Sequence, residues 1–236
     1  TVTLVVTDSA GLVQTLTATV QPDGSYSATP ASALADGSYT VNVSVTDSAG
    51  NTGVDNDNGS VDTTAPTISV VAPDNTNDNT PTITGTTNAA AGSTVTLVVT
   101  DSAGLVQTLT ATVQPDGSYS ATPASALADG SYTVNVSVTD SAGNTGGDAD
   151  TGSVDTTAPT ISVVAPDNTN DNTPTITGTT NAAAGSTVTL VVTDSAGLVQ
   201  TLTATVQPDG SYSATPPSAL ADGSYTVNVS VTDSAG

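Results

Sequence analysis

The chain of 236 residues contains 22 acidic residues and no lysine, arginine or histidine, so its formal net charge is −22. Every acidic residue is aspartate, and cysteine, methionine, tryptophan and phenylalanine are also missing. Nucleic-acid binding is excluded, because neutralising phosphate groups requires basic side chains.

The same composition argues against catalysis and against insertion into a membrane. Enzymes usually take their bases, acids and nucleophiles from histidine, lysine, cysteine and glutamate, and the chain has none of these. No apolar run approaches the ~18 residues that a membrane-spanning helix needs. We therefore expect a protein that is not an enzyme and does not insert directly into a membrane.

The chain repeats itself without gaps at a spacing of 93 residues. The four differences between copies are Val54/Gly147, Asn56/Ala149, Asn58/Thr151 and Ala124/Pro217. Three of them fall in one short acidic segment, whose carboxylates nevertheless persist, since Asp55 and Asp57 match Asp148 and Asp150. This persistence indicates a role for the two carboxylates.

The segment VDTTAP occurs twice, as Val61–Pro66 and Val154–Pro159. Proline fixes φ and keeps the preceding residue out of the helical region, so an extended linker is predicted here. The linkers divide the chain into an incomplete repeat (1–62) that lacks its first two strands, a complete repeat (63–155), and a repeat (156–236) that lacks its last strand. This division indicates a window of a longer array.

The complete repeat is predicted to be all-β, with turn signals between short runs of alternating hydrophobicity. The expected strands, in chain order, are Thr67–Ala72, Pro81–Thr87, Thr94–Thr100, Leu105–Val113, Ser118–Thr122, Ser131–Thr139 and roughly Gly152–Thr156. The acidic stretch Gly147–Asp150 is assigned to the loop before the last strand. Tyr132 is expected to form a tyrosine corner or to be a partly exposed core residue. We predict tandem immunoglobulin-like antiparallel β-sandwich domains in an extended array.

The aspartates predict Ca²⁺, a hard cation that takes six to eight oxygen ligands. In such a sandwich the chain alternates between the two ends, so several loops meet each linker. The set expected at the first linker is Asp8, Asp36, Asp62 and Asp140 with Asn88. The set expected at the second is Asp78, Asp101, Asp129, Asp155 and Asp233 with Asn181. Converging carboxylates repel one another unless a cation bridges them.

The most specific expectation is Ca²⁺ held by Asp62 with Asp140 and by Asp155 with Asp233. A second candidate site joins Asp140 to Asp148 and Asp150. The alternative is that all these side chains are solvated turn carboxylates without metal, because turns rich in aspartate and asparagine have the same appearance.

The pattern DTTAPT…TPTITGTT…AGSTVTL…PDGSYS…LADGSYTVNVSVTDSAGNTG resembles the bacterial immunoglobulin-like tandem repeats of giant type I-secreted adhesins of the repeats-in-toxin and biofilm-associated kind. The resemblance implies an extracellular, cell-surface extender that contacts its neighbouring repeats, is stiffened by Ca²⁺ at its linkers, and leaves ligand binding to a distal module outside this segment. It also implies metal ligands in TDSAGN and DTTAP, namely Asp47, Asp140, Asp233, Asp62 and Asp155.

Three alternatives remain open at the level of sequence. The chain could be an adhesive module that binds glycan or protein, although near-identical repeats argue against specialised binding loops. It could be a self-assembling subunit of an extracellular filament. Adhesion could also use the faces of the strands that are rich in threonine and serine.

Overall fold

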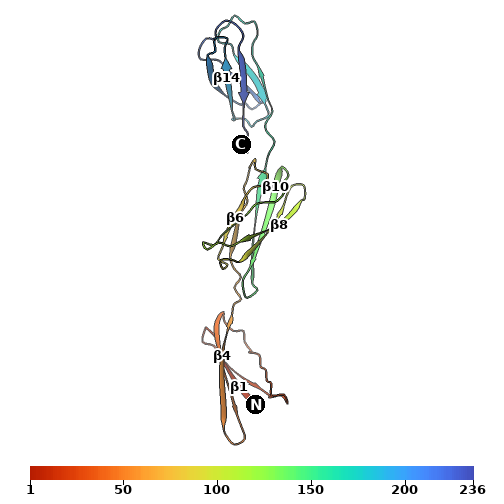
Figure 1. Ribbon diagram of the computed structural model, residues 1–236, viewed down its shortest axis with the longest axis vertical. Coiled ribbons are helices and arrows are strands. Elements are labelled where there is room, and N and C mark those ends of the chain that lie inside the picture. The colour runs from red at the N-terminus through yellow and green to blue at the C-terminus, as the bar shows by residue number, and fades with distance from the viewer.

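The computed structural model describes all residues, 1–236, and contains strands and connecting segments but no helix. Three β-units follow one another in a line, and the chain enters the middle unit at one pole and leaves it at the opposite pole (Figure 1). The predicted fold class, a tandem array of antiparallel sandwich domains, is confirmed. No helix of the chain is long and apolar enough to cross a membrane.

The middle unit is a sandwich of two antiparallel sheets. Its strands are β5 (Ile68–Val71), β6 (Ile83–Thr87), β7 (Thr94–Thr100), β8 (Val106–Thr112), β9 (Ser118–Ala121), β10 (Gly130–Thr139) and β11 (Thr145–Val154). One sheet has the order β5-β6-β9 and the other the order β11-β10-β7-β8. β5 and β11, the first and last strands, therefore lie at the edges of different sheets.

The first six strands lie close to the predicted ranges, but the prediction for the last strand is wrong. β11 begins directly after the turn at Asp140–Asn144 and includes Gly147–Asp150, for which the sequence predicts a loop. It pairs with β10 along its whole length, from Thr139 opposite Thr145 onward. Glycine and aspartate have low strand propensity, and pairing with the regular strand β10 overrides that propensity.

The core of the middle unit is a thin aliphatic layer between the sheets. Fifteen buried residues form it, including Val95, Leu97 and Val99 of β7 and Tyr132, Val134, Val136 and Val138 of β10. These side chains alternate with exposed or half-buried ones along each strand, as the period of two in the sequence predicts.

Tyr132 ties the two sheets together. Its hydroxyl donates a hydrogen bond of 2.8 Å to the carbonyl of Pro73, at the end of β5. A tyrosine corner bonds the backbone a few residues upstream, whereas Pro73 lies 59 residues upstream, so that expectation was wrong. The ring is also fully buried, and burial raises the pKa of Tyr132 to about 12. The hydroxyl therefore remains a donor at neutral pH.

The first unit contains β1 (Val2–Thr7), β2 (Val13–Ala18), β3 (Gly37–Thr46) and β4 (Thr52–Val61) in a single sheet of order β2-β1-β3-β4. The third unit contains β12 (Ile161–Val164), β13 (Ile176–Thr180), β14 (Thr187–Thr193), β15 (Val199–Thr205), β16 (Ser211–Ala214) and β17 (Thr226–Ser230). Its sheets have the orders β12-β13-β16 and β15-β14-β17.

Identical sequences adopt different structures in these units because their partner strands differ. The segment SYSA is a strand at β9 and β16, where it pairs with β6 and β13. The same four residues at 25–28 form no strand, since residues 1–62 contain no counterpart of β6. Tyr26 of this segment is 43% exposed, whereas Tyr119 and Tyr212 are 2% exposed. The strand depends on its partner rather than on its own residues.

Replacing Tyr132 with phenylalanine should lower the stability of the middle unit by ~1 kcal/mol, because a buried tie between the sheets is lost. Tyr26→Phe is the matched control, since that side chain is exposed and is expected to change stability by less than about 0.5 kcal/mol. Urea unfolding of the full chain, followed by tyrosine fluorescence, measures both. Equal effects of the two substitutions would contradict the proposed role of the hydroxyl.

Candidate functional site: the junctions between repeats

The two linkers, Val61–Pro66 and Val154–Pro159, are called here the first and second junctions. Each leaves the end of a long strand, β4 or β11, and leads into the next unit (Figure 1). Hydrogen bonds from the unit behind and the unit ahead hold each linker.

An aspartate of the unit behind holds the paired threonines of each linker. At the second junction, Asp129 accepts hydrogen bonds from the backbone N–H of Thr156 (3.1 Å), from its hydroxyl (2.8 Å) and from the hydroxyl of Thr157 (2.8 Å). Asp36 does the same at the first junction for Thr63 and Thr64, at 3.1, 2.7 and 2.7 Å. The Thr156 hydroxyl is the main reason that the pKa of Asp129 lies below its ordinary value.

In the unit ahead, an asparagine side chain accepts a hydrogen bond from the residue that directly follows each linker. Asn88 accepts a hydrogen bond of 2.8 Å from the backbone N–H of Thr67, and Asn181 accepts the equivalent bond of 2.7 Å from Thr160. At the first junction the side-chain amide of Asn144 also donates to the carbonyl of Asp62 at 3.0 Å. Each linker is therefore held by the unit behind it, and the residue directly after the linker is held by the unit ahead.

The loop Asp140–Asn144 is ordered by its own aspartate. Asp140 accepts bonds from the backbone N–H groups of Ala142 and Asn144, both 2.9 Å, and from the Asn144 side-chain amide at 3.0 Å. This amide is the main cause of the lowered pKa of Asp140. Asn144 thus lies between Asp140 and Asp62, the two residues predicted to share a cation. Asp47 has the same local pattern with Asn51.

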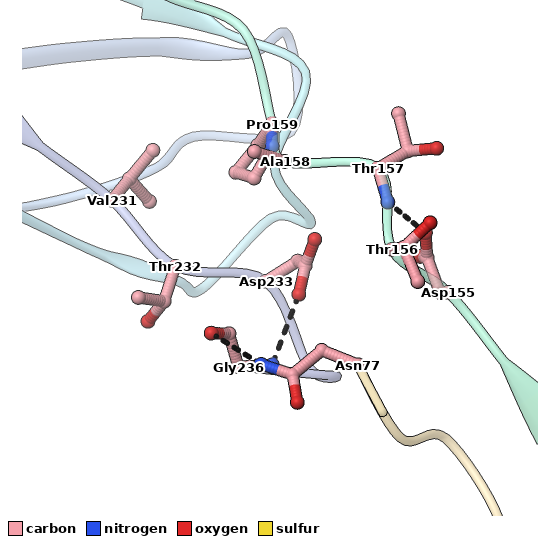
Figure 2. A pocket seen from close by; sticks show the side chains of 10 residues that line it. All are labelled: Asn77, Asp155, Thr156, Thr157, Ala158, Pro159, Val231, Thr232, Asp233 and Gly236. Carbon is pink, nitrogen blue, oxygen red and sulfur yellow. Dashed lines mark hydrogen bonds between the residues drawn. The ribbon is translucent and has the colours of Figure 1, made fainter. Parts of the chain in front are cut away.

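At the second junction a cavity of about 150 Å³ separates the linker from the unit ahead. Figure 2 shows Asp155 on the linker and Asp233 on the neighbouring unit, both lining this cavity. Asp155 accepts a bond from Thr157 at 3.0 Å, and Asp233 accepts bonds from its own turn. On the far side, the amide of Asn75 donates to the carbonyl of Ser234 at 2.6 Å, so the two units touch directly.

The larger sets of aspartates expected around each linker do not converge. No three acidic side chains lie close enough together to hold a metal ion. Asp101, only 7% exposed, accepts three backbone bonds, from Ala103 (3.0 Å), Leu105 (2.8 Å) and Ala128 (3.0 Å). Asp8 makes the same three contacts in the first unit. Asp78 caps its own turn through Thr80.

Asp148 and Asp150 do not lie beside Asp140. They belong to the middle of β11, opposite Val136 and Val134 in the pairing with β10. Their carboxylates accept hydrogen bonds from the backbone N–H groups of β5 and its end, at 3.0 Å and 2.9 Å. The second candidate metal site is therefore not assembled.

The donor atoms at the second junction fit a hard cation in type but are few in number. They are the two carboxylates with the amide and backbone carbonyl oxygens that line the same cavity, and Ca²⁺ takes six to eight such oxygens. At the first junction, Asn144 joins the loop of Asp140 to the backbone carbonyl of Asp62. The structure brings Asp155 and Asp233 to one cavity, and the sharing of a cation by either pair stays a prediction. The sequence patterns did not single out the threonines of the linker as hydrogen-bond donors, a role that the pair of hydroxyl groups in DTTAP could have indicated.

Acid should weaken the loop that Asp101 organises. The N–H of Ala128 is the main cause of a folded-state pKa below the ordinary value of about 4. The stabilisation is therefore complete at neutral pH and is lost as the pH falls through the lowered pKa. Melting temperatures between pH 7 and pH 2 should fall more steeply for the wild type than for Asp101→Asn. The loss of charge repulsion at low pH affects both proteins and therefore cancels when the two slopes are compared. Equal slopes would refute the proposed role of Asp101 in the loop.

The bacterial Ig-like domain family matches residues 1–63, 59–156 and 148–236. No curated protein matches the chain. Among solved structures, a tetra-tandem repeat in the extending region of a large adhesion protein is 42% identical, with a TM-score of 0.38, and the alignment covers all of this chain and 63% of that one.

Two further solved structures belong to ice-binding adhesins. A 1.5-MDa bacterial ice-binding adhesin is 24% identical, covering 98% of this chain and 85% of that one, with a TM-score of 0.43. A Ca²⁺-stabilized adhesin with which an Antarctic bacterium binds ice is 25% identical, covering 98% and 64%, with a TM-score of 0.38. Because its family matches extend over all three units, the chain belongs to the bacterial Ig-like domain family.

Proposed function

We propose that this chain is a structural extender, a spacer within a bacterial cell-surface adhesin that holds a distal binding module away from the cell. The observation that carries the proposal is that the threonines of each linker bond to Asp129 or Asp36 of the unit behind, while the residue directly after the linker bonds to Asn181 or Asn88 of the unit ahead. A chain of domains joined in this way resists bending at the joints.

Each repeat lengthens the array by about the length of its longest strands. The middle unit is entered at one pole and left at the other, so its longest strands lie along the array (Figure 1). A ten-residue strand such as β11 spans roughly 33 Å, and the linker adds to this. We estimate about 35–45 Å per repeat. The protein with a 42% identical chain is described as an extending region, and we propose the same setting here.

Charge supports an extended, non-enzymatic role outside the cell. A net charge of −22 with no basic side chain makes the units repel one another, which disfavours folding back of the array. The aspartates that the structure orders are committed to turns, linkers and strand edges. We infer that the chain works mechanically, through its neighbouring repeats, rather than by acting on a substrate.

We also propose that Ca²⁺ stiffens the junctions, with Asp62 and Asp140 at the first and Asp155 and Asp233 at the second. The support is the chemistry of the donors: both members of the second pair line one cavity, all available ligands are oxygens, and the chain supplies no cation of its own. The hydrogen bonds around Asp129 would then set the direction of the linker, and the cation would limit its remaining freedom.

Replacing Asp129 with alanine should free the second junction, because the linker loses three acceptor contacts to the unit behind it. Small-angle scattering of the full chain should then show a broader distribution of lengths and a smaller average dimension. Asp116→Ala is the control, since Asp116 caps the β8–β9 turn at the pole of the middle unit opposite to the second junction. If the two variants scatter identically and both match the wild type, the fixed linker does not keep the array extended.

Calcium should raise the melting temperature of the full chain and narrow its length distribution, and a chelator should reverse both effects, because a ligand that binds only the folded state stabilises it. The double variant Asp62→Ala, Asp155→Ala keeps every loop-ordering aspartate and should lose most of the response. Melting curves and scattering that are the same in calcium and in chelator would overturn the proposed metal sites without touching the hydrogen-bonded linkers.

A further inference from the structure

β5 and β11 run side by side in the same direction although they belong to different sheets. Three hydrogen bonds join β11 to β5 or to the residues that follow β5, and each of them connects two residues that are 78 apart in the sequence. The parallel bridge between Thr76 and Val154 has the same separation. A constant difference of residue numbers is the register of parallel strands. β11 therefore lies alongside β5 and the segment Ala72–Thr76 that follows it.

Over the first half of this pairing, side chains replace a backbone ladder. Asp148 accepts a hydrogen bond from the N–H of Val70 at 3.0 Å, and Asp150 accepts one from the N–H of Ala72 at 2.9 Å. Alternate residues of a strand point the same way, so residues two apart on β11 match N–H groups two apart on the partner. Val70 and Ala72 are buried, so no water can replace these acceptors without cost.

Over the second half the backbones pair directly. Thr76 donates to the carbonyl of Ser153 at 3.1 Å, Asp155 donates to the carbonyl of Thr76 at 2.9 Å, and Ser153 donates to the carbonyl of Pro73 at 3.3 Å. Asn75, held in the left-handed region at φ 51°, donates its N–H to the Ser153 hydroxyl at 2.8 Å. The close approach requires Gly152, where a Cβ atom would collide with the Pro73 carbonyl.

These two strands carry the ends of the repeat. The preceding linker leads into β5 at the N-terminal pole, and β11 leads into the next linker at the C-terminal pole (Figure 1). Tension along the array pulls β5 towards one pole and β11 towards the other. The bonds between them then lie across the direction of pull and are loaded together rather than one after another.

We propose that β5 and β11, with the segment Pro73–Thr76, form a shear clamp that keeps the repeat folded under tension, and that Asp148 and Asp150 are its fastening side chains. The proposal rests on the proposed extender function, since only a spacer under load needs such a clamp. It gives the two carboxylates a mechanical role.

Two observations within the chain support this assignment. In the first unit, which has no counterpart of β5, the matching Asp55 and Asp57 accept only from the N–H of the residue that follows each of them. Three of the four positions that differ between copies, 147, 149 and 151 in the middle unit, lie in β11, where they alternate with the two aspartates and occupy the opposite face of the strand. Within β11, the variation between copies is therefore confined to the face that does not touch β5.

The clamp can be tested by pulling on single molecules of the full chain. The chain contains no cysteine, so handles can be attached at chosen exposed sites. The pair Ala65→Cys and Ala158→Cys pulls β5 and β11 past each other. The pair Ala65→Cys and Ser141→Cys pulls at one pole only and peels the strands apart. Lifetimes at constant force report the unfolding rate in each geometry.

In the shearing geometry, Asp148→Ala with Asp150→Ala should shorten the lifetime of the middle unit about tenfold, because two buried N–H groups lose their acceptors. The shortening should be much smaller in the peeling geometry. The double variant Asp148→Asn, Asp150→Asn keeps a neutral acceptor of the same shape at each position. Its lifetime under shear should lie between those of the wild type and the double alanine variant. It also provides the test if the alanine variant folds poorly. Asp116→Ala should behave as the wild type.

Equal lifetimes of the wild type and both double variants under shear would overturn the clamp. So would a shortening of the same size in both pulling geometries, which would mean that the carboxylates contribute only general stability. Either result leaves the extender proposal intact, because that proposal is decided by the length and stiffness of the unloaded chain. Conversely, an unloaded chain that is flexible, with a middle unit that still resists shear, would refute the extender proposal and leave the clamp intact.

Discussion

The structure depends on one electrostatic constraint: all 22 ionised side chains are anions, and none has a basic partner. A carboxylate in this chain can be stabilised by protein only through N–H and O–H donors, which favour its ionised form. The aspartates accordingly accept hydrogen bonds from backbone amides and hydroxyls at turns, linkers and strand edges. Asp101 orders a loop, Asp129 orders a linker and Asp150 joins two strands, so the same chemistry builds three levels of the architecture.

The junction follows from this chemistry without requiring any unusual backbone. Proline keeps the linker extended, and the two threonines supply the hydroxyl groups that Asp129 needs. The asparagines of the unit ahead serve the same purpose from the other side, with Asn181 receiving the last part of the linker. The direction from one repeat to the next is therefore encoded in short polar side chains, and a cation at the junction would act on a linker that is already directed.

Much of the fold could be predicted, because the alternation in strands such as β7 and β10 records which face is buried. The strand β11 could not, since its stretch of glycine and aspartate has no hydrophobic pattern and becomes a strand only through its partners. The roles of the aspartates were equally hidden, because Asp148 and Asp101 look alike in sequence and differ only in which amide the fold brings to them. Local pattern located the turns between the hydrophobic strands but could not identify the contacts that their aspartates make.

The turn Asp140–Asn144 has a consequence for how an array of near-identical domains avoids entangling with itself. Neighbours this similar could exchange equivalent strands during folding, a common failure of repeat proteins. For β11 to take its counterpart's place in the next domain, these five residues would have to bridge a whole domain. Fully extended they reach only about 18 Å, roughly half the length of one strand. The short β10–β11 turn therefore keeps each final strand in its own domain. Correct folding of the array depends on the length of this turn rather than on differences in sequence between the domains.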